Sequence, residues 1–147
     1  MSTTSFEALL AEKGSFCYKN VGVSMLPLIR EGRDIIAIQR RPEARLKKYD
    51  VAFFVRPGIV GRGAYVLHRV LRVNPDGTYW IVGDNCIGGE TVREENVIGV
   101  LSAVMRNGKD ITKGIGYWLY IHSNFACRHT RIFLGRVISY LRRILIR

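Results

Sequence analysis

Three short segments of the chain hold side chains that could carry out acyl chemistry. The first reads GVSMLP at residues 22–27, where Ser24 lies between a glycine and a proline. Because proline does not continue a helix, we expect the Ser24 hydroxyl at the rim of a sheet. Its backbone N–H would then face a substrate carbonyl as a minimal oxyanion hole. The alternative interpretation is a serine that satisfies an ordinary turn.

The second segment is the apolar run VLHRVL at residues 66–71, which contains His68. On a strand with a period of two, His68 shares a face with Val66 and Val70. A histidine in this position either has a structural role or acts as a base. Serine is a weak nucleophile unless a neighbouring base accepts its proton, and imidazole suits that task near neutral pH.

The third segment, VGDNCIGGE at residues 82–90, holds Asp84 and Glu90 in a glycine-rich loop directly after a predicted strand. Either carboxylate could accept a hydrogen bond from the second ring nitrogen of His68 and so fix its tautomer. The alternatives are a turn residue for Asp84 and a solvated surface acid for Glu90.

In this order the three segments resemble the type I signal peptidases and the wider superfamily that includes the self-cleaving SOS-type repressors. Residues 22–34 resemble the family's serine box, Gly-x-Ser-Met-x-Pro followed by Gly-Asp. Residues 68–70 match the His-Arg-Val of its archaeal and endoplasmic-reticulum branch, and residues 83–85 match its Gly-Asp-Asn. Residues 47–51 and 98–100 resemble flanking strands, so that the resemblance covers roughly residues 22–106.

The resemblance implies a serine endopeptidase that cleaves a peptide or protein precursor. Ser24 would be the nucleophile, with its amide in the oxyanion hole, and His68 the general base. Glu90 aligns with the orienting acid of the histidine branch, and Asp84 would hold the loop. Three further positions would contact substrate: Gly22, Met25 and Pro27. Gly22 lacks the hydroxyl that serves some members as a second oxyanion donor.

The chain departs from the signal peptidase branch before the serine box. That branch carries a membrane anchor there, whereas this chain has the short polar segment MSTTSFEALLAEKG, and no apolar stretch reaches the roughly 20 residues that a bilayer requires. We therefore expect a protein on the cytoplasmic side, whose substrate is a cytoplasmic peptide or a segment at the membrane surface.

Charge and composition narrow the classes of partner. The 147 residues are 48% hydrophobic and carry a formal charge of +11, with 23 Lys and Arg against 12 Asp and Glu. Nucleic acid, an anionic membrane and an acidic peptide all fit that charge. Nucleic acid is disfavoured because no helix-turn-helix or zinc-finger pattern is present.

The three cysteines, Cys17, Cys86 and Cys127, are odd in number and irregular in spacing. They predict neither a disulfide framework nor a zinc site, and we expect no cofactor. Free thiols in a reducing compartment are the simpler interpretation.

The remaining pattern predicts a mainly β fold: an antiparallel, partly closed, barrel-like sheet of the signal peptidase and SOS-repressor type. A short helix over residues 5–13 precedes it, with Ser or Thr as its N-cap and Gly14 as its stop. Strands are predicted at residues 16–23, 34–39, 50–55, 65–73, 78–82 and 97–105, and the turn Asn74-Pro75-Asp76-Gly77 predicts a hairpin. We divide the chain into a β domain at residues 1–110 and a basic helical extension at residues 111–147.

An amphipathic helix is predicted over residues 131–147, within a segment that has seven Lys and Arg and no acid after Asp110. It either caps the open edge of the sheet or attaches the protein to anionic lipid. Three classes of function thus remain: a serine endopeptidase, a catalytically idle peptide-binding or regulatory module of the same fold, and a basic protein of the membrane surface. The oligomeric state is left open by the sequence.

Overall fold

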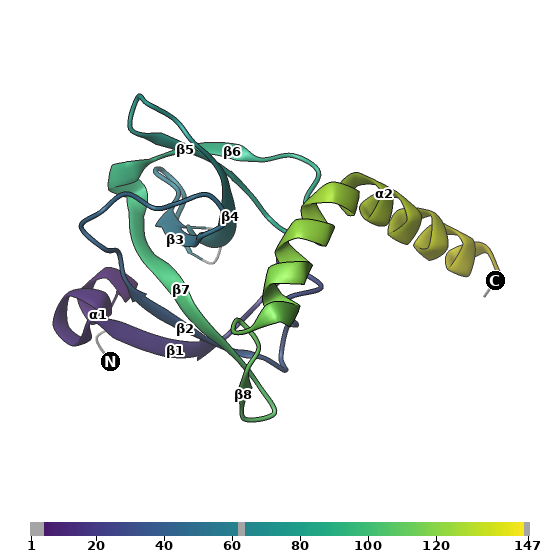
Figure 1. The fold of residues 1–147 in the computed structure, drawn as a ribbon, viewed down its shortest axis with the longest axis horizontal. Helices are drawn as coiled ribbons and strands as arrows, with labels where there is room; N and C mark the ends of the chain where they lie inside the picture. The colour runs from purple at the N-terminus through teal and green to yellow at the C-terminus, as the bar shows by residue number, and fades with distance from the viewer. Residues whose placement is uncertain (1–4, 62–63, 146–147) are drawn as a thin grey trace.

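The structure is a computed structural model and describes residues 5–61 and 64–145. A short helix precedes the strands, and a long helix follows them (Figure 1). The elements in chain order are α1 (Phe6–Lys13), β1 (Ser15–Lys19), β2 (Ile35–Arg40), β3 (Val51–Val55), β4 (Tyr65–Val73), β5 (Thr78–Val82), β6 (Glu90–Arg93), the 3₁₀ turn η1 (Glu94–Asn96), β7 (Val97–Arg106), β8 (Lys109–Asp110) and α2 (Ile115–Leu145).

The strands form one eight-stranded sheet in the order β1-β2-β7-β3-β4-β5-β6, with β8 paired to β7. Every pairing is antiparallel. Register shifts interrupt β2–β7, β3–β7 and β4–β5, and such irregularities bend a sheet. The sheet curves around its core (Figure 1), but within the described residues no pairing joins β6 to β1. The predicted mainly β, antiparallel fold is confirmed, and the sheet is open.

The predicted elements agree with the observed ones where the sequence alternates clearly. β4 and β5 have the predicted bounds, and residues 74–77 form the hairpin turn between them. Helix α1 is also as predicted: Ser5 accepts a hydrogen bond from Ala8 N as the N-cap, and Gly14 ends the helix at a φ of 74°. The sequence did not predict β6, whose four residues ETVR are polar and charged apart from one valine.

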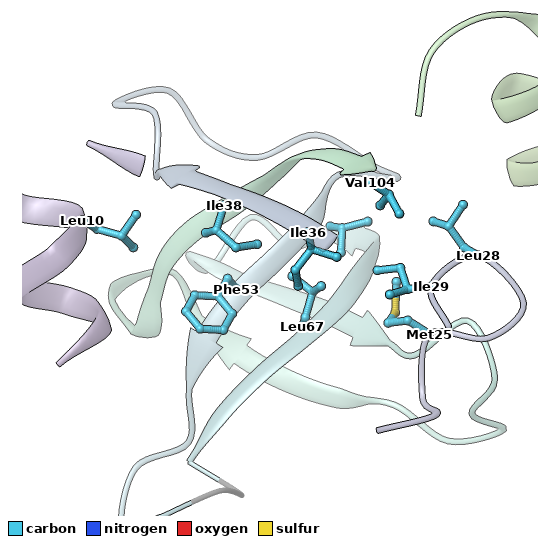
Figure 2. Close-up of a cluster of buried hydrophobic side chains, with 10 residues drawn as sticks. Leu10, Met25, Leu28, Ile29, Ile36, Ile38, Phe53, Leu67 and Val104 are labelled. Atoms are coloured by element: carbon cyan, nitrogen blue, oxygen red, sulfur yellow. The ribbon is translucent and has the colours of Figure 1, made fainter. Parts of the chain in front are cut away.

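The larger core cluster lies between α1, the sheet and the loop from β1 to β2 (Figure 2). That loop contains Ser24 and contributes three of the buried side chains: Met25, Leu28 and Ile29. They pack near the strand residues Ile36 and Val104, which are themselves fully buried. Burial of these side chains therefore fixes the loop on the sheet.

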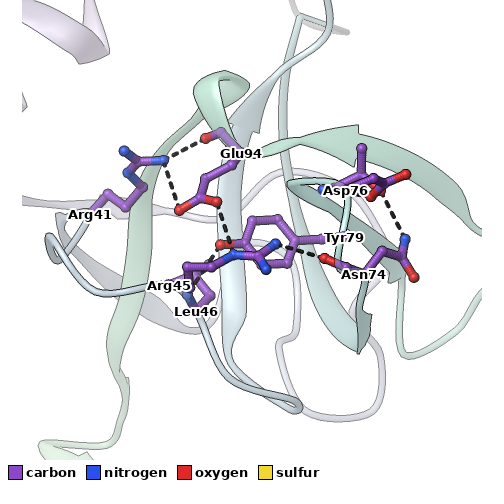
Figure 3. Close-up of polar contacts among 8 residues, drawn as sticks. Arg41, Arg45, Leu46, Asn74, Asp76, Tyr79 and Glu94 are labelled. Carbon is purple, nitrogen blue, oxygen red and sulfur yellow. Dashed lines mark hydrogen bonds and ion pairs between the residues drawn. The ribbon is translucent and has the colours of Figure 1, made fainter.

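Polar contacts fix the connection from β2 to β3 (Figure 3). Arg45 donates to the Glu94 carboxylate at 3.0 Å and to the Asn74 carbonyl at 3.0 Å. Arg41 donates to the Glu94 carbonyl at 2.7 Å, and the backbone N–H of Leu46 donates to the Tyr79 hydroxyl at 3.2 Å. The connection is thereby tied to η1 and to the β4–β5 hairpin.

Helix α2 begins at Ile115, far before the predicted start at residue 131. Its first half packs on the β domain through a stripe of residues spaced three or four apart: Ile121, Asn124, Arg128 and Ile132. Two of these four are polar, so an apolar period does not reveal this half of the helix. In the segment of the chain that is described, no helix is long and apolar enough to cross a membrane.

The second half of α2 projects away from the sheet (Figure 1). The predicted apolar face is exposed there, including Leu134, Ile138 and Leu141. The interpretation of this face as a cap on the open sheet edge is therefore wrong, because nothing in the β domain covers it. Among the described residues of the extension, those up to Ile132 contact the domain.

A buried ion pair joins α2 to the sheet. Arg69 on β4 and Asp84 in the β5–β6 loop are both fully buried and share two hydrogen bonds, at 2.9 and 2.7 Å. The Tyr120 hydroxyl of α2 donates to the same carboxylate at 2.7 Å, and Arg131 donates to the Asp84 carbonyl at 2.7 Å. Burial disfavours the charged guanidinium, but the hydrogen bonds and charge of Asp84 raise the pKa of Arg69.

Replacing Asp84 by Asn should lower the free energy of unfolding by about 3–5 kcal/mol, because it leaves the Arg69 charge buried without a counterion. Urea unfolding followed by circular dichroism measures this. The control is Glu95→Gln, which breaks the exposed Arg93–Glu95 pair and should leave the midpoint unchanged. Equal midpoints for Asp84→Asn and wild type would contradict the assigned role of the pair.

Candidate active site

Ser24 lies in the loop between β1 and β2, in a turn that the structure holds at several points. Gly22 has a φ of 103°, which strongly favours glycine at this position. The peptide bond between Leu26 and Pro27 is cis. The backbone N–H of Ile29 donates a hydrogen bond to the Met25 carbonyl at 2.9 Å. Ser24 is thus presented next to a residue whose side chain is in the core.

The end of the same loop is anchored by Asp34, whose side chain is fully buried. Its carboxylate accepts hydrogen bonds from Arg106 at 2.6 and 3.0 Å and from the backbone N–H of Arg30 at 2.8 Å. Arg106 also donates to the Leu28 carbonyl at 2.7 Å. The hydrogen bonds from Arg106 lower the pKa of Asp34 to about 2, so the carboxylate is charged at neutral pH.

His68 lies on β4 with only 8% of its surface exposed, and its two ring nitrogens face different partners. Nδ1 is 3.6 Å from Glu90 Oε1. Nε2 faces Gly83: a Cβ placed on that glycine would lie 3.0 Å from Nε2 and 2.8 Å from the Ser24 carbonyl oxygen. The ring therefore stands between an acid and the serine loop, as a base in a Ser-His-acid array would.

The pKa of His68 is lowered from its ordinary value, chiefly because burial disfavours the charged imidazolium. The negative charge of Glu90 opposes this effect, and the positive charge of Arg56 adds to it. A neutral imidazole at neutral pH is the form that can accept a proton.

Glu90 is held in place by Arg56, which donates to its two oxygens at 2.9 and 2.5 Å. These hydrogen bonds lower the pKa of Glu90, so the acid beside His68 is ionised. Arg56 comes from the turn after β3 and Glu90 from the start of β6. The arrangement of β3, β4 and β6 in one sheet brings the two charges and the imidazole together.

Of the two acids that the sequence left open, the structure brings Glu90 to His68 and Asp84 to Arg69. His68 and Arg69 are neighbours on β4 and point to opposite faces of the strand. The Asp84 carboxylate is engaged on the Arg69 side by Arg69 and Tyr120. Asp84 thus holds the loop, and Glu90 has the position of an orienting acid.

The loop after β5 bonds directly to the serine loop. Asn85 N–H donates to the Ser24 carbonyl at 2.7 Å, and the Asn85 side chain donates to the Val23 carbonyl at 3.2 Å. Gly83 lies where these two loops and His68 meet, and its missing side chain permits the close approach. The position of Ser24 relative to His68 is therefore set by the Gly-Asp-Asn segment.

Ser24 and His68 both line a cleft of about 320 Å³. The other lining groups include Tyr18, Tyr65 and Arg56. Part of its wall is therefore aromatic, while the charged Arg56 stands at the same cleft. An apolar side chain of a bound molecule fits beside the aromatic part of such a lining.

Within the described part of the chain, no hydrogen bond joins the Ser24 hydroxyl to His68. The Ser24 amide likewise donates to no protein acceptor there. An amide with no intramolecular acceptor can donate to a bound carbonyl or anionic oxygen. Catalytic hydrogen bonds are often long in unliganded enzymes and shorten when substrate binds.

The three predicted substrate-contacting residues fall in different environments. Gly22 is partly exposed and Pro27 is exposed, both on the serine loop. Met25 is 1% exposed and belongs to the core cluster, so its side chain does not contact a substrate. The expectation for Met25 is corrected on this ground: the side chain anchors the loop.

The contacts of two site residues could not be foreseen from the sequence. Arg56 belongs to the turn Arg56-Pro57-Gly58, and nothing in its neighbours links it to Glu90, which is 34 positions away. Asn85 is part of the Gly-Asp-Asn segment, but its contact with the serine loop spans 61 positions and follows from the fold alone. The sequence identified Gly83 as part of the motif but did not predict its position between the serine loop and His68.

Comparison with protein-family models and with curated proteins gave no match to this chain. Among the residues that the structure describes, no group of three or more His, Cys, Asp and Glu side chains is placed to hold a metal ion. The three cysteines are free thiols.

Two substitutions should move the pKa of His68 in opposite directions. Glu90→Gln removes a charge that raises it and should lower it further, whereas Arg56→Gln should raise it. NMR titration of the imidazole protons measures both, with His68→Ala for assignment and Glu95→Gln as the exposed control. The pKa of His68 in the folded protein lies below the ordinary value of 6.5. The stability that neutral His68 contributes is therefore present above pH 6.5 and is lost as the pH falls through the folded-state pKa. A wild-type pKa above 6.5 would contradict this description.

Gly83→Ala should disturb the site, because the added methyl group would meet the Ser24 carbonyl at 2.8 Å and His68 Nε2 at 3.0 Å. Overpacking of this kind costs about 1–3 kcal/mol, which urea unfolding measures, and His68 resonances should shift. Gly88→Ala is the matched control, since its Cβ would meet nothing within 4 Å. Equal behaviour of the two variants would rule out the close approach at Gly83.

Proposed function

We propose that the protein is a serine endopeptidase of the signal peptidase-like, histidine-base type, with Ser24 as the nucleophile and His68 as the general base. The observation that carries the proposal is the orientation of the His68 ring, with Nδ1 toward Glu90 and Nε2 toward the serine loop across Gly83. Three segments distant in sequence meet at this ring, which supports a role for His68 in activating Ser24.

In the proposed reaction the Ser24 hydroxyl attacks the scissile carbonyl carbon while His68 Nε2 accepts its proton. The tetrahedral oxyanion receives a hydrogen bond from the Ser24 amide. His68 then donates the proton to the leaving amine, which leaves an acyl group on Ser24, and water releases it by the same steps in reverse order. Glu90, fixed by Arg56, stabilises the imidazolium formed in each step.

We propose a peptide or protein precursor on the cytoplasmic side as the substrate. The three free cysteines support a reducing compartment. The cleft that holds Ser24 and His68 has room for a peptide segment of a few residues, and its aromatic lining by Tyr18 and Tyr65 favours an apolar side chain there.

A catalytically idle peptide-binding module of the same fold is the second candidate. The observation that favours it is that the Ser24 hydroxyl and His68 share no hydrogen bond in the described part of the chain. Such a module would bind a peptide in the same cleft and release it without cleavage.

Ser24→Ala should abolish cleavage of a proteome-derived peptide library, read by mass spectrometry, because the proposed acyl intermediate forms on the Ser24 hydroxyl. We expect a loss of roughly 10³-fold or more, together with loss of labelling by a fluorophosphonate probe. His68→Ala should reduce both to a similar extent. Ser102→Ala, which removes an exposed hydroxyl on β7, should leave both unchanged.

Equal cleavage by the wild type and Ser24→Ala would overturn the peptidase proposal. Peptides retained but not cut by the wild type, with no probe labelling, would favour the idle module instead.

A further inference from the structure

The second half of α2 carries an apolar face that the protein itself does not cover. We call residues 133–145 the distal segment of α2. All of its large hydrophobic side chains with described exposure lie open to solvent, from 37% exposed at Val137 to 66% at Tyr140. They are Phe133, Leu134, Val137, Ile138, Tyr140, Leu141 and Ile144.

These side chains gather on one side of the helix. At about 100° per residue they occupy one continuous arc of roughly 160°. The positions that pack on the β domain in the first half, such as Asn124 and Arg128, project onto the opposite side, together with Gly135 and Ser139. The apolar arc of the distal segment therefore faces away from the β domain, which is the reverse of a helix that packs on its own sheet.

Arginines border the apolar arc on both sides. By the same helical geometry, Arg142 lies next to one edge of the arc, and Arg136 and Arg143 lie next to the other. Arg136 and Arg143 also line a cleft of about 620 Å³ between the helix and Asn85. No acidic residue occurs after Asp110, so no carboxylate within α2 balances these charges.

The charges decide between the possible occupants of this surface. A second copy of the chain would bring two arginine-bordered faces together without any acid to pair them. Nucleic acid would engage the arginines but leave the apolar arc in water. An anionic lipid surface satisfies both features at once, with acyl chains against the arc and phosphates beside the arginines.

We propose that the distal segment of α2 docks the protein on an anionic membrane surface, with the helix lying in the plane of the interface. Tyr140 at the edge of the arc has the amphipathic side chain expected at headgroup depth. This inference goes beyond the proposed peptidase activity and does not depend on Ser24 or His68.

Vesicle flotation with the full chain tests the proposal. Vesicles of phosphatidylcholine with a minor share of phosphatidylglycerol should carry the protein at low salt, at least about tenfold better than vesicles of phosphatidylcholine alone. High salt should weaken the binding, because the arginine–phosphate attraction is screened.

Two pairs of variants separate the apolar and the charged contributions. Ile138→Ser with Leu141→Ser should reduce binding by more than about tenfold, and Arg136→Gln with Arg143→Gln should remove the preference for phosphatidylglycerol. The matched controls change exposed residues of the β domain: Ile59→Ser with Val60→Ser, and Arg72→Gln with Lys109→Gln. All four positions in the helix are exposed, so the variants should keep the wild-type circular dichroism spectrum.

Three results would overturn the proposal. The full chain could stay in solution with anionic vesicles, or the Ile138 and Leu141 variant could bind as well as its β-domain control. Light scattering could also show a dimer that the same variant dissolves while no vesicle binds, which would make the face an interface between two copies. Flotation of the Ser24→Ala variant with anionic vesicles would show that membrane binding does not require the proposed peptidase activity.

Discussion

The buried pair of Arg69 and Asp84 is the interaction on which the arrangement of the site depends. Both side chains are fully buried, and their hydrogen bonds join β4, the loop after β5 and, through Tyr120, the helix α2. Asp84 lies between Gly83, which approaches His68, and Asn85, which bonds to the Ser24 carbonyl. A charge that must be paired inside the protein thus sets the position of the loop that joins the serine to the histidine.

Two adjacent residues of β4, His68 and Arg69, point to opposite faces of the sheet. Arg69 points to the side where α2 packs, and His68 points to the side of the cleft. The same strand therefore anchors the helix on one face and presents an imidazole on the other. On the cleft side, Glu90 and Arg56 act on His68 with opposite signs, so the basicity of the ring reflects both the ion pair beside it and its burial.

Helix α2 changes its role along its length. Its first half uses Tyr120, Asn124 and Arg128 to contact the β domain, and the apolar arc of its distal segment faces away from that domain. Helix α2 bonds to the Asp84 loop through Tyr120 and Arg131 and carries an uncovered apolar face in its distal segment. The helix therefore connects the loop beside His68 to the surface of the distal segment.

The sequence by itself determined the local structure and the order of the site segments. Alternating apolar residues defined β4 and β5, and Ser5 and Gly14 defined the ends of α1, because period and capping chemistry act over a few residues. It also singled out Ser24, His68, Asp84 and Glu90 as candidates, although only the family resemblance favoured Glu90 over Asp84 as the orienting acid. It missed β6, in which Val92 is the single apolar residue, and the first half of α2, in which the polar Asn124 and Arg128 are among the buried positions. A search for periodic apolar residues does not detect such segments.

Tertiary structure alone decided which candidates meet. The contact of Glu90 with His68, the bond of Asn85 to the Ser24 carbonyl and the ion pair of Arg56 with Glu90 join residues tens of positions apart. The burial of Met25 and the exposure of the distal segment were likewise decided by packing. These contacts and exposures have the same physical reason. The environment of a side chain depends on which elements the sheet brings beside it, and that is a property of the whole fold.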